Sequence, residues 1–348
     1  MMNSKFTSWE NQNCEMPDTE AREQASGEGI AIWKAKVLRE LVGAVKFMDI
    51  TCGMGIDSWA LSQVFPEGWA AEESPSLFSI TQKNFTQLGI YNIDLKLGDG
   101  VSLAKSSGAG VLYADPDRRK KGERLKDPQK FSPPLKDLLQ LSDTLQIPLL
   151  IKYSPMMDAE EGKRIIPGLE EIWFCSEGGE MKEINFFRRP TPLKKISIRM
   201  YAHTSRGEYI HSGYPNIPYL LNSPVTWNPG QSLWIPDPAV RLSGLWPENC
   251  QISPNRNLAV LFDDQETMAG TLWSYLDHCP FKQGKLSDWL SAKGITSQLN
   301  VSAKFTRIHT PDLLKKWKLK PGGDYLLWIG LLFPQNTELS AVLLIKKS

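Results

Sequence analysis

The sequence predicts an α/β protein built on a doubly wound parallel sheet, with an N-terminal helical extension and a smaller C-terminal α+β region. Three observations support this prediction. Short apolar runs alternate with segments of helical periodicity between residues 46 and 215, which is typical of βαβ units. A glycine turn follows the first apolar run. Residues 204–230, rich in Gly, Pro, Ser and Asn, separate this part from the rest of the 348-residue chain.

The first 45 residues are expected to form the helical extension. Residues 1–27 are polar and weakly patterned, whereas apolar side chains recur at helical spacing from Ile30 onward. These apolar positions are Ile30, Trp33, Val37, Leu38, Leu41, Val42 and Val45. An amphipathic helix is therefore expected to lead into the first strand.

Eight apolar runs are predicted as strands of the sheet, and three periodic segments are predicted as helices between them. The strands are 45–50, 69–73, 93–97, 110–114, 147–152, 171–175, 183–187 and 195–200. The helices are 58–65, 76–88 and 135–145. Because no helical segment separates the last two strands, we expect these two to form an antiparallel hairpin at the edge of the sheet.

The C-terminal region is predicted to be a smaller α+β fold. Residues 258–262, 325–332 and 340–345 resemble strands, and a helix is expected to start at residue 310 with proline in its first turn. Residues 281–348 contain eleven basic and four acidic side chains, a net charge of +7. This charge is compatible with binding a polyanion such as RNA, and equally with an ordinary lysine-rich, solvated surface.

Composition narrows the class of protein further. The five cysteines are odd in number and show no C-x-x-C spacing, which argues against a zinc site and against a disulfide framework. The N-terminus lacks the apolar core of a signal peptide, and no stretch reaches the ~20 apolar residues of a membrane span. We therefore expect a soluble, cytoplasmic protein without a bound metal and without a membrane partner.

The turn after the first strand, residues 49–57, reads D-I-T-C-G-M-G-I-D and is the strongest candidate for a ligand site. Gly53 and Gly55 permit positive φ and close approach of the backbone to a ligand. The helix that follows can donate N–H groups to a carboxylate. We expect this loop to bind S-adenosylmethionine, with Asp49 facing the amino group or a water molecule on it. The loop residues assigned to the cofactor are Asp49, Thr51, Cys52, Gly53 and Gly55.

Acidic residues at the next two strand ends extend this predicted site. Glu72 lies seventeen residues past Gly55, at the end of the second strand, where a carboxylate would bind a ribose diol. Strand alternation lets only one of Glu72 and Glu73 point into the site, and we assign Glu72. Asp99 follows the third strand and either contacts the adenine amino group or serves as a turn residue. A dinucleotide site is disfavoured, because Ser58 replaces the last glycine of G-x-G-x-x-G.

The fourth strand ends in Asp115 and Pro116, which we predict to be catalytic. Proline stiffens the turn and can hold the carboxylate near the transferred methyl group. Arg118 and Arg119 follow within residues 118–130, a segment with seven basic and two acidic side chains. These arginines are predicted to hold the phosphates of a nucleic acid. The alternative is a charged surface loop without a ligand.

Two further residues lie close to the predicted site. Lys152 ends the fifth strand and is assigned to substrate contact, although an ordinary strand-to-helix turn explains it equally well. Cys52 would suit a nucleophile for methylation of a pyrimidine carbon. It lies in the glycine loop rather than after the fourth strand, so we reject that role.

These segments together resemble a known family, the bacterial class I S-adenosylmethionine-dependent methyltransferases that have a C-terminal THUMP-like domain. Residues 49–57 resemble the family's D-L-T-x-G-x-G-x-D loop, 115–119 its D-P-x-R-R segment and 154–158 its S-P-M-x-D segment. Further segments similar to the family are 23–28, 33–35, 179–183, 234–242 and 320–325. The resemblance covers nearly the whole chain with its motifs in order, which is more specific than any single motif.

Four residues depart from the family pattern. Gly27 stands where serine is usual, Met181 replaces cysteine, Asp237 replaces asparagine and Leu242 replaces lysine. These departures concern substrate contacts more than the cofactor loop.

The resemblance implies a Rossmann-like methyltransferase sheet and a defined order of domains. The implied domains are the helical extension 1–45, the methyltransferase domain 46–215, a ferredoxin-like module 230–275 and the THUMP-like domain 276–348. S-adenosylmethionine is the implied cofactor, and a base of tRNA or rRNA is the implied substrate. Two alternatives stay open: a methyltransferase that acts on a small molecule or protein, and a catalytically inactive RNA-binding protein.

Overall fold

The computed structural model divides the chain into two compact units, Met1–Tyr214 and Pro215–Ser348. The residues it describes are 5–17, 22, 25–120, 123–191, 195–216, 218–220, 227–248, 250–254, 256–261, 269–282, 284–304, 306–333 and 338–347. Outside this description lie, among others, Glu23 and Gln24 of the segment 23–28, Lys121 and Gly122 of 118–130, and Phe262 of 258–262. No helix within the described ranges is long and apolar enough to cross a membrane.

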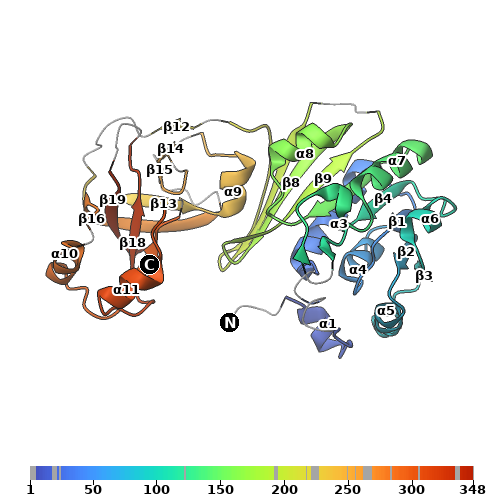
Figure 1. Ribbon diagram of the computed structural model, residues 1–348, viewed down its shortest axis with the longest axis horizontal. Coiled ribbons are helices and arrows are strands. Elements are labelled where there is room, and N and C mark those ends of the chain that lie inside the picture. The colour runs from blue at the N-terminus through green and yellow to red at the C-terminus, as the bar shows by residue number, and fades with distance from the viewer. Residues whose placement is uncertain are drawn as a thin grey trace. The chain divides into compact units, whose positions relative to one another are not determined.

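The first unit is built on a nine-stranded mixed sheet (Figure 1). Its strands are β1 (Phe47–Asp49), β2 (Gly68–Glu72), β3 (Ile93–Leu97), β4 (Val111–Ala114), β7 (Leu149–Tyr153), β8 (Leu169–Glu177), β9 (Glu180–Arg188), β10 (Ser197–Thr204) and β11 (Gly207–Gly213). Their order is β11-β10-β8-β9-β7-β4-β1-β2-β3. The segment from β7 to β3 is parallel throughout, whereas β9 is antiparallel to both of its neighbours.

Helices cover both faces of this sheet. They are α1 (Thr7–Asn11), α3 (Glu28–Val42), α4 (Ile56–Ser62), α5 (Pro75–Gln87), α6 (Gly100–Ala104), α7 (Leu135–Leu145), α8 (Ala159–Ile165) and the 3-10 helix η1 (Pro128–Lys130). α3, α4 and α5 share one apolar cluster with Phe187 of β9. The adjacent Arg188 points to the opposite face, where it pairs with Asp143 of α7 at 2.6 Å. Phe186 lies on that same face, against Gly162 of α8.

Most of the elements expected from periodicity are confirmed. The long helix of the N-terminal extension is α3, whose residues Ile30, Trp33 and Leu38 are buried. It ends at Gly43, which has a φ of 77° and so allows the chain to turn into β1. The segments predicted as 93–97 and 135–145 are β3 and α7 with the same bounds. Periodicity predicts α7 well because this helix buries a single face, with Leu135, Leu138 and Leu141.

The predicted edge hairpin of 183–187 with 195–200 is wrong. The segment 183–187 belongs to β9, which pairs with β8 and β7 in the interior of the sheet. Gly178 and Gly179, with φ of 62° and 77°, form a tight turn that folds β9 back onto β8. β10 then adds in parallel to the other side of β8.

Residues 207–213, predicted as part of a linker, form the edge strand β11. β11 pairs antiparallel with β10 along its whole length. Its side chains are mostly half-buried or exposed, so the segment lacks the apolar run by which the other strands were found. A short hairpin of β5 (Arg119–Lys120) and β6 (Glu123–Arg124) forms a separate two-stranded sheet after β4.

The second unit is built on an eight-stranded, mostly antiparallel sheet in the order β12-β14-β15-β13-β16-β19-β18-β17. Its strands are β12 (Tyr219–Leu220), β13 (Ser232–Pro236), β14 (Cys250–Ile252), β15 (Ala259–Leu261), β16 (Gly270–Pro280), β17 (Asn300–Ser302), β18 (Tyr325–Gly330) and β19 (Ser340–Lys346). Its helices are α9 (Pro238–Ser243), α10 (Leu286–Ala292) and α11 (Thr310–Lys316). The predicted helix start at residue 310 is confirmed, with Pro311 in the first turn.

Both accessory modules expected from the sequence contribute strands to this one sheet. β16 runs through residue 275, the expected boundary between them, and pairs with β13 on one side and β19 on the other. The second unit is thus held together by a continuous sheet rather than by two separate ones.

Candidate active site

The glycine loop leads from the end of β1 into α4. Gly53 and Gly55 have φ of 57° and 92°, so both adopt the positive values that glycine permits. A Cβ added at Gly55 would lie 2.6 Å from the Phe85 ring, so the space there admits only glycine without displacement. A Cβ added at Gly53 would meet no atom of the described residues within 4 Å. Ligand atoms can therefore approach the Gly53 backbone closely.

Glu72, at the end of β2, reaches this loop. Its Oε2 accepts a hydrogen bond of 2.8 Å from the Gly53 N–H, and its Oε1 accepts one of 2.8 Å from the Ser74 N–H. The neighbouring Glu73 is exposed. Of the two acids, Glu72 is therefore the one in contact with the glycine loop, and its role as a ribose-binding carboxylate remains a prediction.

Asp49 is fully buried beneath the loop. It accepts hydrogen bonds from the Ser58 hydroxyl at 2.5 Å and from the Thr51 N–H at 3.0 Å. Burial raises the pKa of Asp49 to about 7, although both hydrogen bonds lower it. Ser58, which breaks the dinucleotide pattern in the sequence, thus serves as a partner of Asp49.

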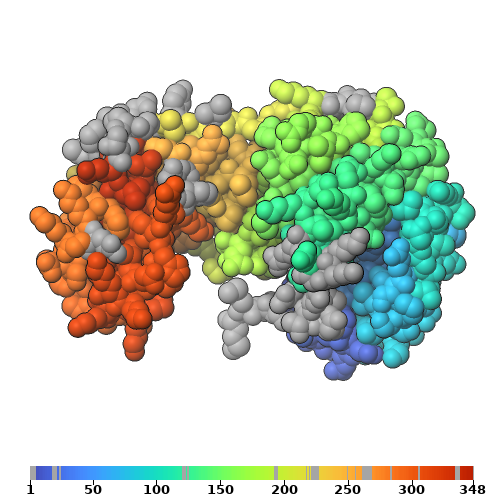
Figure 2. All heavy atoms as spheres, in the orientation of Figure 1, coloured from blue at the N-terminus to red at the C-terminus, as the bar shows by residue number. Residues whose placement is uncertain are grey.

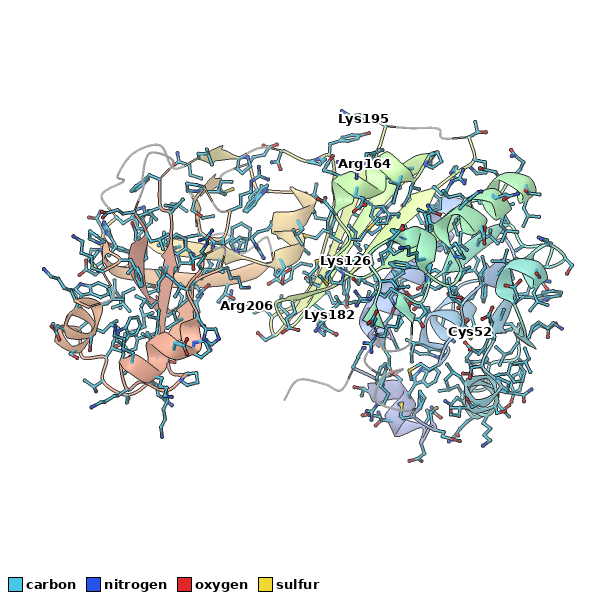
Figure 3. The ribbon with its side chains drawn as sticks, in the orientation of Figure 1. Cys52, Lys126, Arg164, Lys182, Lys195 and Arg206 are labelled. Carbon is cyan, nitrogen blue, oxygen red and sulfur yellow. The ribbon has the colours of Figure 1, made fainter. Side chains whose placement is uncertain are left out.

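Cys52 lies in the same loop, beside the N-terminal end of α4 (Figure 3). Its thiol is buried, and burial together with the nearby Asp49 carboxylate raises its pKa well above the ordinary value. A thiol held in its protonated form is a poor nucleophile, in agreement with the role rejected from the sequence.

Asp99 has a structural role in the turn after β3. It is the N-cap of α6 and accepts hydrogen bonds from the N–H groups of Val101 and Ser102, at 3.2 and 3.1 Å. Its side chain is exposed. The turn role is therefore observed, and contact with an adenine remains a prediction.

Asp115 follows β4 and is attached to the glycine loop. Its N–H donates to Thr51 Oγ1 at 2.6 Å, so the backbone of the predicted catalytic segment is fixed to the predicted cofactor loop. Its Oδ2 accepts a bond of 2.5 Å from Lys152 Nζ. The Asp115 side chain is 33% exposed, so solvent or a substrate can reach it. Burial raises the pKa of Asp115, and the charge of Lys152 acts against that rise.

The segment after Pro116 turns back toward the loop that follows β7. Arg118 Nη1 donates to Ser154 Oγ at 2.6 Å, and the Arg119 N–H donates to Asp117 Oδ1 at 2.9 Å. The structure therefore brings Arg118 to Ser154, within the two segments that resemble the D-P-x-R-R and S-P-M-x-D motifs. Contact of either arginine with a phosphate remains a prediction.

Lys152, which the sequence assigns to substrate contact, lies in the interior of the protein. Its side chain is only 7% exposed and is paired with Asp115. Because β7 lies next to β4, Lys152 reaches Asp115 from the interior of the protein. Its ammonium group thus lies on the interior side of the Asp115 carboxylate and not at the protein surface.

A buried ion cluster beside this site was missed from the sequence. Lys34 Nζ of α3 lies 2.8 Å from Asp57 Oδ1 of α4 and 2.8 Å from Glu183 Oε1 of β9. The Ser26 hydroxyl lies 2.8 Å from Asp57 Oδ2 and 3.0 Å from Glu183 Oε2, so its single proton is donated to one of them or shared by both. Lys34 also donates to the Tyr113 hydroxyl at 3.2 Å. These contacts attach the N-terminal extension to the glycine loop and to the sheet.

One signal in the sequence could have revealed this cluster. Lys34 lies four residues after Ile30 and four before Leu38, so helical spacing places it on the apolar face. A charged residue at such a position must find a partner when the face is buried. The identity of its partners, Asp57 and Glu183, could not be read from that spacing.

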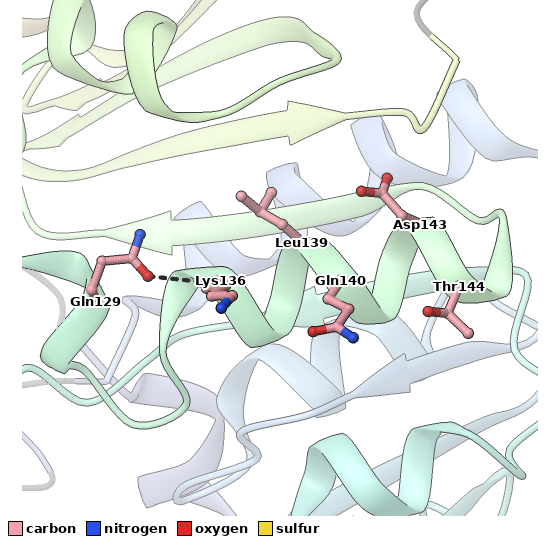
Figure 4. Close-up of a pocket in the computed structure, with 6 residues that line it drawn as sticks. All are labelled: Gln129, Lys136, Leu139, Gln140, Asp143 and Thr144. Carbon is pink, nitrogen blue, oxygen red and sulfur yellow. Dashed lines mark hydrogen bonds between the residues drawn. The ribbon is translucent and has the colours of Figure 1, made fainter.

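A hollow of about 630 Å³ lies along the outer side of α7 (Figure 4). The residues that line it are Gln129, Lys136, Leu139, Gln140, Asp143 and Thr144. None of the residues predicted for the cofactor or the acceptor lines this hollow. Among the described residues, no cluster of His, Cys, Asp or Glu side chains could hold a metal ion.

Comparison with known proteins supports the fold. No protein-family model and no curated protein matches the chain. A solved structure from Porphyromonas gingivalis W83, provisionally described as a methyltransferase, matches 96% of this chain and 84% of its own, with 20% identity and a TM-score of 0.73. The chain therefore has a Rossmann-like methyltransferase fold followed by a second, mostly antiparallel sheet region.

Two partial matches are weaker. A protein of Pyrococcus horikoshii, provisionally described as an RNA methyltransferase, matches 54% of this chain and 98% of its own, with 12% identity and a TM-score of 0.38. An rRNA methylase of Streptococcus thermophilus matches 46% of this chain and 95% of its own, with 15% identity and a TM-score of 0.35.

Proposed function

We propose that the protein is an S-adenosylmethionine-dependent methyltransferase that acts on a base of RNA, either tRNA or rRNA. One observation carries the proposal. Thr51 of the glycine loop accepts the backbone N–H of Asp115, and Gly53 of the same loop donates to Glu72. The glycine loop, which is suited to bind the cofactor, is thus hydrogen-bonded to Asp115, the acid that is suited to contact the methyl acceptor.

The residues present fit S-adenosylmethionine. The open space at Gly53 admits a ligand next to the backbone. Each carboxylate oxygen of Glu72 accepts one backbone N–H and keeps a further lone pair for a ribose hydroxyl. Asp49, once ionised, can attract the cofactor's ammonium group, and Asp99 lies at the next strand end for the adenine. When bound, the cofactor supplies an electrophilic methyl group.

On the acceptor side, Asp115 is the group that contacts the substrate. Its partly exposed carboxylate can accept an N–H hydrogen bond from an exocyclic amine, which directs the nitrogen lone pair toward the methyl group. Pro116 restricts the backbone directly after this carboxylate. Because transfer to an amine requires alignment more than a strong base, a fixed carboxylate is sufficient.

RNA as the substrate class is supported by charge at two places. Arg118 lies beside the acceptor side of the site and is suited to a phosphate. In the second unit, the segment 304–320 exposes six basic side chains on and around α11. They are Lys304, Arg307, Lys315, Lys316, Lys318 and Lys320. Figure 2 shows this part of the chain in orange. Such a surface attracts a polyanion.

The domain assignments belong to this proposal as well. We assign 1–45 to the helical extension, 46–215 to the methyltransferase domain, 230–275 to a ferredoxin-like module and 276–348 to a THUMP-like domain. The last two would bind RNA through its shape and backbone.

The cofactor half of the proposal is tested by calorimetry with S-adenosylmethionine and S-adenosylhomocysteine. Glu72→Ala is expected to weaken binding at least about tenfold, because it removes a carboxylate from a ribose diol. Glu73→Ala is the matched control, since this neighbouring acid is exposed and is expected to leave the affinity unchanged. Equal affinities for both variants would remove Glu72 from the site.

The substrate half is tested by transfer of labelled methyl groups into RNA from a strain that lacks the protein, followed by mapping of the modified nucleotide. Incorporation that requires Asp115 supports the proposal. Cofactor binding without incorporation into RNA indicates a small-molecule or protein methyltransferase. RNA binding without cofactor binding indicates an inactive RNA-binding protein.

A further inference from the structure

Asp115 is fixed from behind by a buried lysine. We propose that Lys152 is a positioning residue, which holds the Asp115 carboxylate in one orientation so that its second oxygen remains turned toward the methyl acceptor. The proposal rests on the proposed function of Asp115, but it concerns a residue that does not itself touch the substrate.

The contacts of Asp115 leave it little freedom. Its backbone N–H donates to Thr51 Oγ1 at 2.6 Å, and its Oδ2 accepts from Lys152 Nζ at 2.5 Å. Oδ1 has no hydrogen bond partner within the described residues, and the side chain is 33% exposed. One oxygen is therefore held from the interior, while the other is available at the surface.

Lys152 is itself held by the buried ion cluster. Its Nζ lies 4.0 Å from Asp57 Oδ2, and Asp57 is paired with Lys34, which also pairs with Glu183. Including Asp115, these ion pairs join two lysines to three carboxylates, and the cation of Lys5 also acts on Lys152 and Glu183. Burial lowers the pKa of Lys152, but the carboxylates of Asp115, Asp57 and Glu183 outweigh that effect and raise the pKa, which keeps Lys152 charged. Side chains from α3, α4 and β9 thus help to hold the ammonium group of Lys152, on β7, at the interior side of Asp115.

The chemical consequence concerns the protonation state of Asp115. An ionised carboxylate accepts the N–H of an amine, whereas a protonated one donates and competes for the lone pair that must attack the methyl group. Burial favours the protonated form of Asp115, and Lys152 opposes it. Among the described residues, the groups that act most strongly on Asp115 are Lys152 of β7, Asp57 of α4 and Lys34 of α3, and Asp49 of β1 and Tyr113 of β4 also interact with it.

The first test is a titration of Asp115 by carbon NMR in the full-length protein, with no need for activity. In Lys152→Met the Asp115 pKa is expected to rise by at least about one unit, a tenfold change in proton affinity. If that variant does not fold, Lys152→Gln serves the same purpose, since it keeps a hydrogen bond donor and removes only the charge. Lys163→Met, on α8, is the control. An Asp115 pKa that is unchanged in the variant would overturn the proposal.

The second test is a double-mutant cycle on methyl transfer. Lys152→Met alone is expected to lower kcat at neutral pH about tenfold or more, to move the acidic limb of the pH profile upward and to leave the KM for the cofactor within about twofold. Lys152→Arg should restore part of kcat. In an Asp115→Asn background, Lys152→Met should have no further effect, because it acts through Asp115.

The outcomes separate this inference from the proposed function. Additive effects in the cycle show that Lys152 does not act through Asp115, and they contradict the inference. If the wild-type protein transfers no methyl group to RNA, the proposed function fails, while the NMR titration still decides whether Lys152 controls Asp115.

Discussion

At the scale of single residues, burial of charge dominates the chemistry of the candidate site. Asp49, Asp57 and Lys34 would each be unstable in the interior without a partner, because removing a charge from water is costly. Asp57 and Lys34 form a pair, and the pKa of Asp57 is lowered to about 2, chiefly by Lys34 acting against the effect of burial. Among the described residues, Asp49 has hydroxyl and backbone partners but no paired cation, so burial raises its pKa.

This difference predicts how stability depends on pH. In the native state Asp49 keeps a proton up to about pH 7, whereas the unfolded chain releases it near 3.8. The native state binds more protons between these values, so the free energy of unfolding falls as pH rises from about 4 to about 7. Asp49→Asn should reduce this fall by roughly 1–4 kcal/mol, measured by urea unfolding across that range.

Two features make the measurement specific for Asp49. The stabilisation from Asp57 is lost only as pH falls from 3.8 toward 2, which lies below the range studied. Asp94→Asn, at an exposed position, is the control and should keep the wild-type dependence. The same slope in Asp49→Asn and wild type would show that Asp49 is ionised throughout this range.

At the scale of elements, helix α3 of the N-terminal extension contributes a side chain, Lys34, to the surroundings of the candidate site. Lys34 joins it to α4 through Asp57 and to β9 through Glu183, at 2.8 Å in both cases. The side chains of Lys34 and Glu183 are buried, and that of Asp57 is 13% exposed. The glycine loop ends in α4, so the position of that loop depends on this contact.

Replacement of Lys34 by methionine is therefore expected to destabilise the protein by about 3–5 kcal/mol, since two carboxylates lose their buried cation. Lys36→Met, on the exposed side of the same helix, is the matched control and should change stability by less than about 0.5 kcal/mol. Thermal and urea unfolding report both effects. Similar values for the two variants would mean that water or another cation replaces Lys34.

The strands of the parallel core were predicted from the sequence, but the position of β9 in the sheet was not. The parallel strands β1 to β4 and β7 were found because each is a short apolar run between helices or turns. The position of β9 between β7 and β8 depends on which neighbours complete its backbone hydrogen bonds. That choice is made by the assembled sheet, and the sequence of β9 alone is compatible with an edge or an interior position.

At the scale of the whole molecule, charge is distributed unevenly along the chain. Residues 1–30 have a net charge of −4 and residues 281–348 a net charge of +7, although the total is only +1. The basic residues of 304–320 are exposed on the second unit, where they can attract a polyanion over a distance of about one Debye length.

The RNA proposal therefore predicts a salt-dependent contribution from this surface. A triple variant that replaces Lys315, Lys316 and Lys318 by glutamine should weaken binding of RNA and reduce the slope of log K against log salt by roughly 2. The matched triple of Lys36, Lys83 and Lys105 removes the same charge from exposed positions of the first unit. Filter binding at several salt concentrations measures both. Equal slopes for the two triples would exclude 304–320 as the RNA surface.

The sequence by itself determined the α/β class, the parallel core and the placement of acids at strand ends. These follow from local patterns, because apolar periodicity specifies an element and the carboxyl ends of parallel strands meet at one edge. It also indicated which segments, 49–57 and 115–119, lie at that edge. Each of these conclusions needs only residues that are close together in the chain.

Only the tertiary structure decided how the charges are paired. Lys152 lies behind Asp115 rather than on the surface, and Lys34 meets Asp57 and Glu183 in the interior. Glu183 is distant from Lys34 in sequence, and no local pattern links them. The partner of a buried charge depends on which elements pack together, and the physical reason is that desolvation penalises every arrangement in which such a charge is left alone.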